Sequence, residues 1–404
     1  MSSAEAASAA PSATRLPRAV KLFGLVSLLN DFASEMIYPL LPAFVTGVLG
    51  AGAGALGALD GAAEFASAIV KYVSGRLADR PARRGRLVVL GYTAAVLVRP
   101  VIAFTGAAWQ VIGLRVVDRL GKGLRTPPRD AIIADATPPP LRGRAFGLQR
   151  GLDHLGAVLG PLLAWYLLAF HQASVRGVIA ASIVPGVLVL VLAVWAVKDG
   201  QRRATTVGGG EGRATPPPST ALHRPRPPLA LFAISFFYLL RMPETLMILR
   251  SQQLGVSVAS VLLLWAALHV VRSSTSFGGG ALTDRIGAAR TMWLGWAAYA
   301  LIAAGFAVAQ GAVQAWALFL ALGVVAGLTE SPERALVAKL AGVRQGSGFG
   351  VYHGVTGLAA LVGGVGLGAV FQIYGAAPAF LASAAGGGAL VLGWPVLAGR
   401  AGRE

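Results

Sequence analysis

The sequence contains no cysteine and little charge. Only 13% of its 404 residues are charged, whereas a soluble globular chain carries about 25%. The lack of cysteine excludes a disulfide framework and a thiolate metal site. The chain has no G-x-x-x-x-G-K-[ST] phosphate loop, which argues against a nucleotide-driven motor. Residues 1–18 are polar and rich in Ala and Ser, without the apolar core of a secretory signal, so we expect a disordered cytoplasmic tail.

The sequence instead contains long apolar runs. The chain is 55% hydrophobic and has a mean hydropathy of +0.66. A helix of about 20 apolar residues crosses a bilayer and satisfies its own backbone hydrogen bonds. We therefore predict an all-α membrane protein with twelve transmembrane helices, at 20–48, 54–75, 86–106, 109–134, 145–170, 177–197, 229–250, 257–278, 289–309, 314–340, 347–372 and 377–397.

The net charge of +18 is concentrated in alternate loops. Segments such as 76–86 are rich in Arg, whereas 47–54 and 310–315 carry no charge, and Arg176 and Arg250 are exceptions to the pattern. The positive-inside rule places the basic loops and both termini in the cytoplasm, as expected for a multi-pass protein of the cytoplasmic (inner) membrane. Membrane topology accounts for the charge, so we predict no nucleic-acid partner.

The chain divides into two similar halves. Residues 199–228 are rich in Gly, Pro, Thr and Arg and predict a flexible cytoplasmic linker. GRLADR at 75–80 matches GALTDR at 280–285, and the segment at 142–160 resembles that at 345–363. A repeat of six helices is a transporter architecture, with pseudo-twofold symmetry and a substrate site between the halves. The expected domains are a tail (1–18), a six-helix bundle (19–198), the linker, a second bundle (229–398) and a tail (399–404).

Several motifs resemble those of the major facilitator superfamily. Gly75-x-Leu77-Ala78-Asp79-Arg80 resembles the motif between helices 2 and 3, and Asp284-Arg285 belongs to its second copy between helices 8 and 9. Arg115-x-x-Asp118 resembles the helix-4 motif. Gly156-x-x-x-Gly160-Pro161 resembles the helix-5 motif of proton antiporters. The resemblance implies alternating-access transport and slightly favours export. It implies a cytoplasmic gate that includes Gly75, Asp79, Arg80, Asp284 and Arg285, with Gly75 allowing a neighbouring helix to approach closely.

Apart from Asp135 at its end, segment 109–135 carries seven charges, and they fall within an arc of roughly 140° at 100° per residue. Each would cost about 2.5 to 3.5 kcal/mol facing lipid, so the stripe must face protein or a water-filled cavity. We assign Arg129 and Asp130 to the gate, and Lys122 and Arg125 to an anionic group of the solute. Pro127 and Pro128 predict a kink or opening that leaves carbonyls near Gly123 unpaired. The predicted cavity residues of this stripe are Arg115, Asp118, Arg119, Lys122 and Arg125.

Carboxylates on the first two segments are candidates for proton coupling. Asp31 and Glu35 share one helix face, as do Asp60 and Glu64, and acids inside a membrane mark proton and ion pathways. The alternative is that some of these acids form structural ion pairs with the many arginines. Further predicted cavity residues are Asp153, Arg241, Glu244, His269 and His353.

The expected function is secondary transport of a small organic solute rather than an enzymatic reaction. We expect proton antiport in the direction of export by a monomer embedded in lipid, without a cofactor or resident metal. A proton-coupled importer of an organic anion or metal complex, a passive uniporter, and a non-transporting receptor or scaffold remain alternatives. A soft metal ion as the solute is a minor alternative, suggested by Met242, Met247 and His269.

Overall fold

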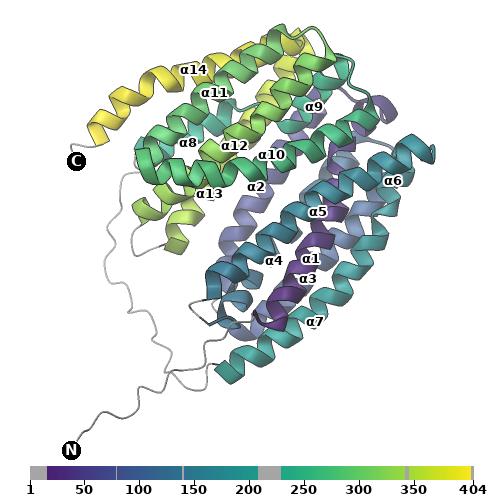
Figure 1. Cartoon of the computed structure of the whole chain (residues 1–404). Coiled ribbons are helices and arrows are strands. Elements are labelled where there is room, and N and C mark those ends of the chain that lie inside the picture. The colour runs from purple at the N-terminus through teal and green to yellow at the C-terminus, as the bar shows by residue number, and fades with distance from the viewer. Residues whose placement is uncertain (1–15, 79, 139–140, 208–228, 342–344, 402–404) are drawn as a thin grey trace, which may run out of the picture.

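The computed structural model describes residues 16–78, 80–138, 141–207, 229–341 and 345–401, and these are helical apart from short connections. The helices form two groups that lie side by side (Figure 1). The first bundle contains α1 (Arg18–Glu35), η1 (Tyr38–Leu40), η2 (Ala43–Val48), α2 (Ala53–Ala78), α3 (Pro81–Val101), η3 (Ile102–Phe104), α4 (Ala108–Asp135), α5 (Arg142–Phe170), α6 (Val175–Ala181) and α7 (Ile183–Val207). The second contains α8 (Leu229–Leu240), α9 (Glu244–Gln253), α10 (Val258–Ile286), α11 (Ala288–Val308), α12 (Ala312–Ala341), α13 (Gln345–Tyr374) and α14 (Ala376–Ala401).

These elements match the twelve predicted segments. Within the described ranges, ten helices are long and apolar enough to cross a membrane by length and composition. Segments 20–48 and 109–134 are not among the ten, since the helices they contain, α1 and α4, carry several charges each. These two helices therefore hold half of the predicted coupling and cavity residues.

Three predicted segments are not continuous α-helices, contrary to expectation. Segment 20–48 leaves the α-helix at Glu35 and continues as a 3-10 turn and a π-helical turn around Pro39 and Pro42, because proline cannot supply the i→i−4 hydrogen bond. Segment 177–197 is interrupted at Ser182. Segment 229–250 is interrupted before Pro243 and forms α8 and α9.

Two other expectations are corrected. Helix α7 continues to Val207, so residues 199–207 are helical rather than part of a linker. Helix α4 is continuous through Pro127 and Pro128, so it does not open there. The carbonyl of Gly123, which faces the missing N–H of Pro127, instead accepts a hydrogen bond from Ser74 Oγ of α2 at 2.7 Å. This partner satisfies the carbonyl group without a break.

The internal repeat extends to individual hydrogen bonds. Ser74 of α2 donates to Gly123 O of α4, and Thr275 of α10 donates to Gly323 O of α12 at 2.8 Å. In both bundles a hydroxyl of the second membrane-spanning segment (α2 or α10) thus donates to a glycine carbonyl of the fourth segment (α4 or α12). The small glycines let the helix backbones approach closely enough for this contact.

The two bundles meet along two pairs of helices, α2 with α13 and α5 with α10. We call the end where α1 begins and α7 ends the terminal end, and the end that carries α6 and the end of α9 the far end (Figure 1). Near the far end the backbones of Gly57 and Gly364 are in direct contact. Gly54 N also donates to Gln372 Oε1 at 2.9 Å.

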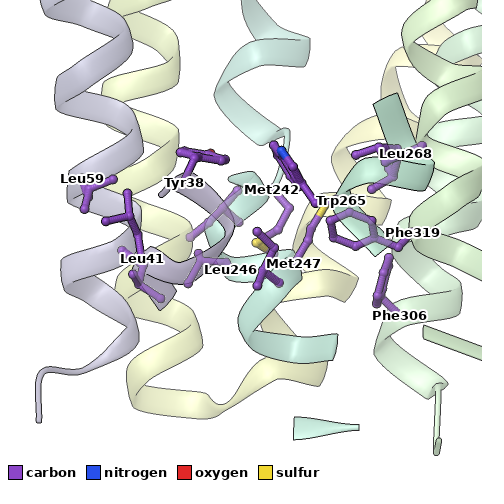
Figure 2. Packing of buried hydrophobic residues seen from close by; sticks show 14 of the residues in the cluster. Tyr38, Leu41, Leu59, Met242, Leu246, Met247, Trp265, Leu268, Phe306 and Phe319 are labelled. Atoms are coloured by element: carbon purple, nitrogen blue, oxygen red, sulfur yellow. The ribbon is translucent and has the colours of Figure 1, made fainter. Parts of the chain in front are cut away.

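A hydrophobic core also crosses between the bundles. Tyr38 and Leu59 of the first bundle lie in the same buried cluster as Leu246, Met247 and Trp265 of the second (Figure 2). The rings of Tyr38 and Trp265 are 5.0 Å apart. The far half of the molecule is therefore closed by packing between the bundles.

Candidate functional site

The most buried charges of the first bundle form one ion-pair network. Asp118 of α4 accepts hydrogen bonds from Arg99 Nε and from Arg115 Nη1, each at 2.9 Å. The three side chains are at most 4% exposed. A carboxylate that binds two guanidinium groups compensates part of the cost of burying them. Arg115 and Asp118 were predicted to line the cavity, and the structure places them inside the bundle.

Asn30 extends this network to α1. Its carbonyl and side-chain oxygens accept from Arg99 at 3.0 and 3.1 Å, and the side-chain oxygen also accepts from Arg125 at 3.3 Å. Arg125 donates to Gly91 O and lies over the Tyr92 ring. Arg125 is 2% exposed, so it is engaged within the bundle rather than free to meet a solute.

Arg119 and Lys122 differ from the other bases of α4. Both are partly exposed. Within the described residues, neither side chain makes a hydrogen bond to protein or an ion pair within 4.0 Å, although the backbone carbonyl of Lys122 accepts from Thr126 Oγ1. Glu64 of α2 is exposed, yet its electrostatic neighbours are Lys71, Arg119 and Lys122 of the first bundle and His353 of α13. Because its charged neighbours come from both bundles, Glu64 lies between the bundles rather than against lipid.

Two carboxylates of the first bundle bind directly to the second. Glu35, at the end of α1, accepts a hydrogen bond from Trp265 Nε1 at 3.0 Å and lies 4.0 Å from His269 Nε2. Both His269 ring nitrogens are buried and have no hydrogen-bond partner among the described atoms. His269, a predicted cavity residue, thus lies beside Glu35 at the contact between the bundles.

Asp60 makes the second contact between the bundles. Its carboxylate accepts from Thr245 N at 3.1 Å, from Thr245 Oγ1 at 2.7 Å and from Tyr38 OH at 3.1 Å. Thr245 is the second residue of α9, whose N-terminal neighbour Pro243 provides no capping side chain. A carboxylate at a helix N-terminus satisfies a free N–H group and interacts favourably with the helix dipole. Asp60 therefore caps a helix of the opposite bundle.

The interruption between α8 and α9 is stabilised by the second bundle. Leu240 O accepts from Ser383 Oγ, and Met242 N donates to Tyr299 OH, each at 2.6 Å. Beside the interruption, Glu244 pairs with Arg272 and with Arg241, the latter at 3.3 Å. The predicted cavity residues Arg241 and Glu244 are thus joined in one cluster, together with Arg272.

The predicted site missed Glu333 of α12. This carboxyl group is 2% exposed and accepts hydrogen bonds from Tyr352 OH at 2.9 Å and from Tyr238 OH at 3.3 Å. The sequence places Glu330 and Glu333 in a predicted membrane segment, which was the available signal. The tyrosines that bind Glu333 come from α8 and α13, and their proximity depends on tertiary packing.

The remaining coupling and cavity candidates, Asp31 and Asp153, lie near the same group of charged residues. Asp31 Oδ1 accepts from Asn30 Nδ2 at 2.9 Å. Asp31 and Asp153 are electrostatic neighbours of Lys122, and Asp153 also pairs with Arg150 at 3.4 Å. In the described part of the chain, no group of three or more His, Cys, Asp or Glu residues is placed to hold a metal ion.

Among the described gate residues, no hydrogen bond or ion pair joins the two bundles at the terminal end. A Cβ atom at Gly75 would have open space around it, so the expected close helix contact at Gly75 is wrong for this structure. Arg80 and Arg285 are exposed, and Arg129 pairs with its neighbour Asp130 at 2.9 Å. Asp79, like the side chain of Asp284, lies outside the described residues.

The helix-5 motif has a packing role. A Cβ atom at Gly156 would lie 3.0 Å from Phe32 N, and one at Gly160 would lie 3.0 Å from Phe32 C, with the neighbouring carbonyl oxygens closer still. Pro161 continues the motif inside α5. These glycines allow α5 to contact the backbone of α1 directly, next to the segment that carries Asp31 and Glu35.

The fold and the buried charges between two related bundles define a polytopic membrane transporter. The family model of the Major Facilitator Superfamily matches residues 23–364, so the chain belongs to that superfamily. Membership makes it a secondary transporter of small molecules.

Similar proteins agree with this assignment. An uncharacterized MFS-type transporter of Methanocaldococcus jannaschii is 29% identical over 351 residues, 86% of each chain. Multidrug resistance protein MdtH of Aeromonas hydrophila is 31% identical over 146 residues, 36% of each chain. Among solved structures, a peptide transporter has a TM-score of 0.77 at 17% identity, covering 96% of this chain and 95% of its own. A nucleoside transporter has a TM-score of 0.71 at 13% identity, covering 94% and 99%. At these identities the solved structures support the fold alone.

Proposed function

We propose that this protein is a proton-coupled transporter that moves a small organic solute across the cytoplasmic membrane by alternating access. The observation that carries the proposal is the position of Asp60 and Glu35. Both are carboxylates of the first bundle that accept hydrogen bonds from the second, and neither has a Lys or Arg ion-pair partner among the described residues.

Proton binding at these carboxylates would change the contacts between the bundles. An ionised Asp60 favours the capped α9 and the closed far half, because the N-terminal N–H groups and the helix dipole interact with negative charge. A neutral Asp60 loses most of this interaction. Proton binding that destabilises one conformational state relative to the other shifts the equilibrium between them. Such a shift is the requirement for coupling.

The proposal also covers the orientation of the protein, its oligomeric state and its solute. The basic loops support a cytoplasmic terminal end, and we propose that the protein acts as a monomer in lipid. Gly156 and Gly160 are used for the contact between α1 and α5, so the helix-5 motif gives no independent support for export. The partial similarity to a multidrug resistance protein is compatible with an organic solute.

Reconstituted vesicles test the proposal. Vesicles loaded with a metabolite extract, or placed in one, receive a pH gradient of either direction, and mass spectrometry identifies the solutes that accumulate. We expect gradient-driven accumulation by the native protein. Asp60→Asn and Glu35→Gln should lose uphill accumulation but keep solute exchange without a gradient.

Two outcomes would contradict it. Full gradient-driven accumulation by the Asp60→Asn, Glu35→Gln double variant would exclude these residues from coupling. If no solute accumulates or exchanges under any gradient, the receptor or scaffold alternative gains support instead.

A further inference from the structure

Arg119 and Lys122 are cations that have no carboxylate in contact within the part of the chain that the structure describes. They lie one turn apart on α4 and share its inner face. The neighbouring bases Arg115 and Arg129 each hold a carboxylate at 2.9 Å. Within the described residues Arg119 and Lys122 have no such partner, and their nitrogen atoms are not buried. Two like charges one turn apart repel each other.

The surroundings of this cation pair are internal and come from several helices. The pair lies within electrostatic reach of protein carboxylates that do not touch it. Those near Arg119 include Glu35 of α1 and Glu64 of α2. Those near Lys122 are Asp31 of α1 and Asp153 of α5. The two cations are therefore partly exposed and lie among carboxylates from three helices that do not contact them directly.

We propose that the transported solute carries an anionic group, such as a carboxylate, sulfonate or phosphate, that binds between Arg119 and Lys122. The proposal rests on the proposed transport function. An Arg guanidinium group offers paired N–H donors to such an oxyanion, and a Lys ammonium adds a mobile point charge. The solute anion would take the place that a protein carboxylate takes beside Arg115.

The sign of the solute charge determines the direction of coupling. The bases that face Glu64 are Lys71, Arg119, Lys122 and His353. Lys71 also faces Lys122, and Arg129 and Arg150 face Asp153. A proton on any of these carboxylates removes a negative charge near the cation pair and strengthens anion binding. Coupling between two bound ligands is reciprocal, so protons and the anion bind together.

Symport is the consequence. Protons and an anionic solute that favour each other's binding cross the membrane in the same direction, which is import under an inward proton gradient. A cationic solute would compete with protons at the same carboxylates and would give antiport. The unpaired bases therefore favour import of an organic anion over the export expected from the helix-5 motif.

Charge-sorted solutes test this inference. A metabolite extract is separated by ion exchange into anionic, neutral and cationic fractions, and each is added to vesicles that contain a pH-sensitive dye. We expect the anionic fraction alone to drive protons into vesicles with the native protein. Arg119→Gln and Lys122→Gln should each lower the initial rate at least about tenfold, the factor produced by about 1.4 kcal/mol of binding free energy.

Matched variants exclude a general loss of charge or fold. Lys122→Arg keeps the charge and should retain proton uptake. Arg290→Gln removes one exposed Arg at the terminal end and should leave the rate unchanged. Thermal unfolding of the purified variants checks that each one is folded.

The outcomes separate this inference from the proposed function. Proton movement driven only by the cationic or neutral fraction would overturn the inference and leave proton-coupled transport intact. Anion-driven proton uptake that survives the Arg119→Gln, Lys122→Gln double variant would also overturn it. If no fraction moves protons, the proposed function itself fails.

Discussion

Asp118 shows how single residues make charge tolerable inside this protein. It is 1% exposed and binds Arg99 and Arg115. Asp118→Asn would leave two buried guanidinium groups without a counter-charge, and breaking a buried ion pair in this way costs about 3 to 5 kcal/mol. We expect a large loss of thermal stability, measured by unfolding of the purified protein in detergent.

Asp130→Asn is the control for that change. Its side chain is 41% exposed and pairs with the adjacent Arg129. Arg129 is only 12% exposed, but the Asp130 carboxylate is in contact with solvent, where an ion pair contributes about 1 kcal/mol or less, so the melting temperature should change little. Equal destabilisation by the two variants would contradict the structural role of the Asp118 network.

The sequence could predict that the charges of α4 face inward, but not which of them are neutralised. The helical periodicity puts Arg119 and Arg125 in one stripe. Their different environments arise from Asn30, whose oxygen reaches Arg125, and this contact joins residues far apart in the chain. Arg176 and Arg250 were exceptions to the loop-charge pattern. Each donates to a carbonyl group at the end of a neighbouring helix. Arg176 donates to Thr105 O and Arg250 donates to Ala309 O, both at 3.0 Å.

At the scale of elements, glycine positions determine which helices touch. A Cβ atom at Gly160 would collide with the backbone of Phe32, whereas one at Gly75 would meet nothing within 4 Å. Gly160→Ala should therefore destabilise the protein by about 1 to 3 kcal/mol through overpacking. Gly75→Ala should be neutral or stabilising by up to about 1 kcal/mol, since Ala is the better helix former.

Unfolding measurements on these two variants check the prediction directly. The same substitution in two helices of one bundle controls for helix propensity. A stabilising Gly160→Ala would show that α1 and α5 are not in backbone contact, and the helix-5 motif would then need another explanation.

The interruption between α8 and α9 depends on side chains from other helices. Tyr299→Phe removes the acceptor for Met242 N and a partner of Ser383. An unsatisfied buried N–H group costs about 1 to 3 kcal/mol, so we expect a clear drop in the melting temperature. Tyr166→Phe is the matched control, because Tyr166 is 46% exposed. Equal stability of both variants would argue against this support of the interruption.

The helix count followed from apolar length, whereas the interruptions did not. Pro127 and Pro128 lie in a continuous α4, but Pro39, Pro42 and Pro243 lie at breaks. Ser74 supplies a hydrogen bond to the carbonyl left free in α4. Whether a proline breaks a helix is therefore decided by neighbours that the local sequence does not contain.

At the scale of the whole molecule, the basic loops predict which end of the protein faces the cytoplasm. Because the chain has no native cysteine, single cysteines report their own side of the membrane. Val313, 84% exposed, lies at the far end, and Arg290 lies at the terminal end. In intact cells a membrane-impermeant maleimide should label Val313→Cys and reach Arg290→Cys only after lysis. The opposite pattern would invert the topology.

The cap formed by Asp60 links one carboxylate to the opening of the far half. Thr245→Val removes the hydroxyl that donates to Asp60 at 2.7 Å. Hydrogen bonds to charged groups contribute about 1.5 to 3 kcal/mol, enough to change a two-state ratio about tenfold or more. Spin labels on Val48→Cys and Ile373→Cys, which are 46% and 69% exposed, report the separation of the bundles there.

We expect Thr245→Val and Asp60→Asn to add a population with longer distances between these labels. Thr93→Val serves as the control, because the Thr93 hydroxyl donates to Val89 O within its own helix. If all three variants give the native distance distribution, Asp60 does not hold the far half closed. If Asp60→Asn alone lengthens the distance, the carboxylate charge at the α9 terminus, rather than the threonine hydroxyl, holds the two bundles together, and proton binding at that one residue is sufficient to release them.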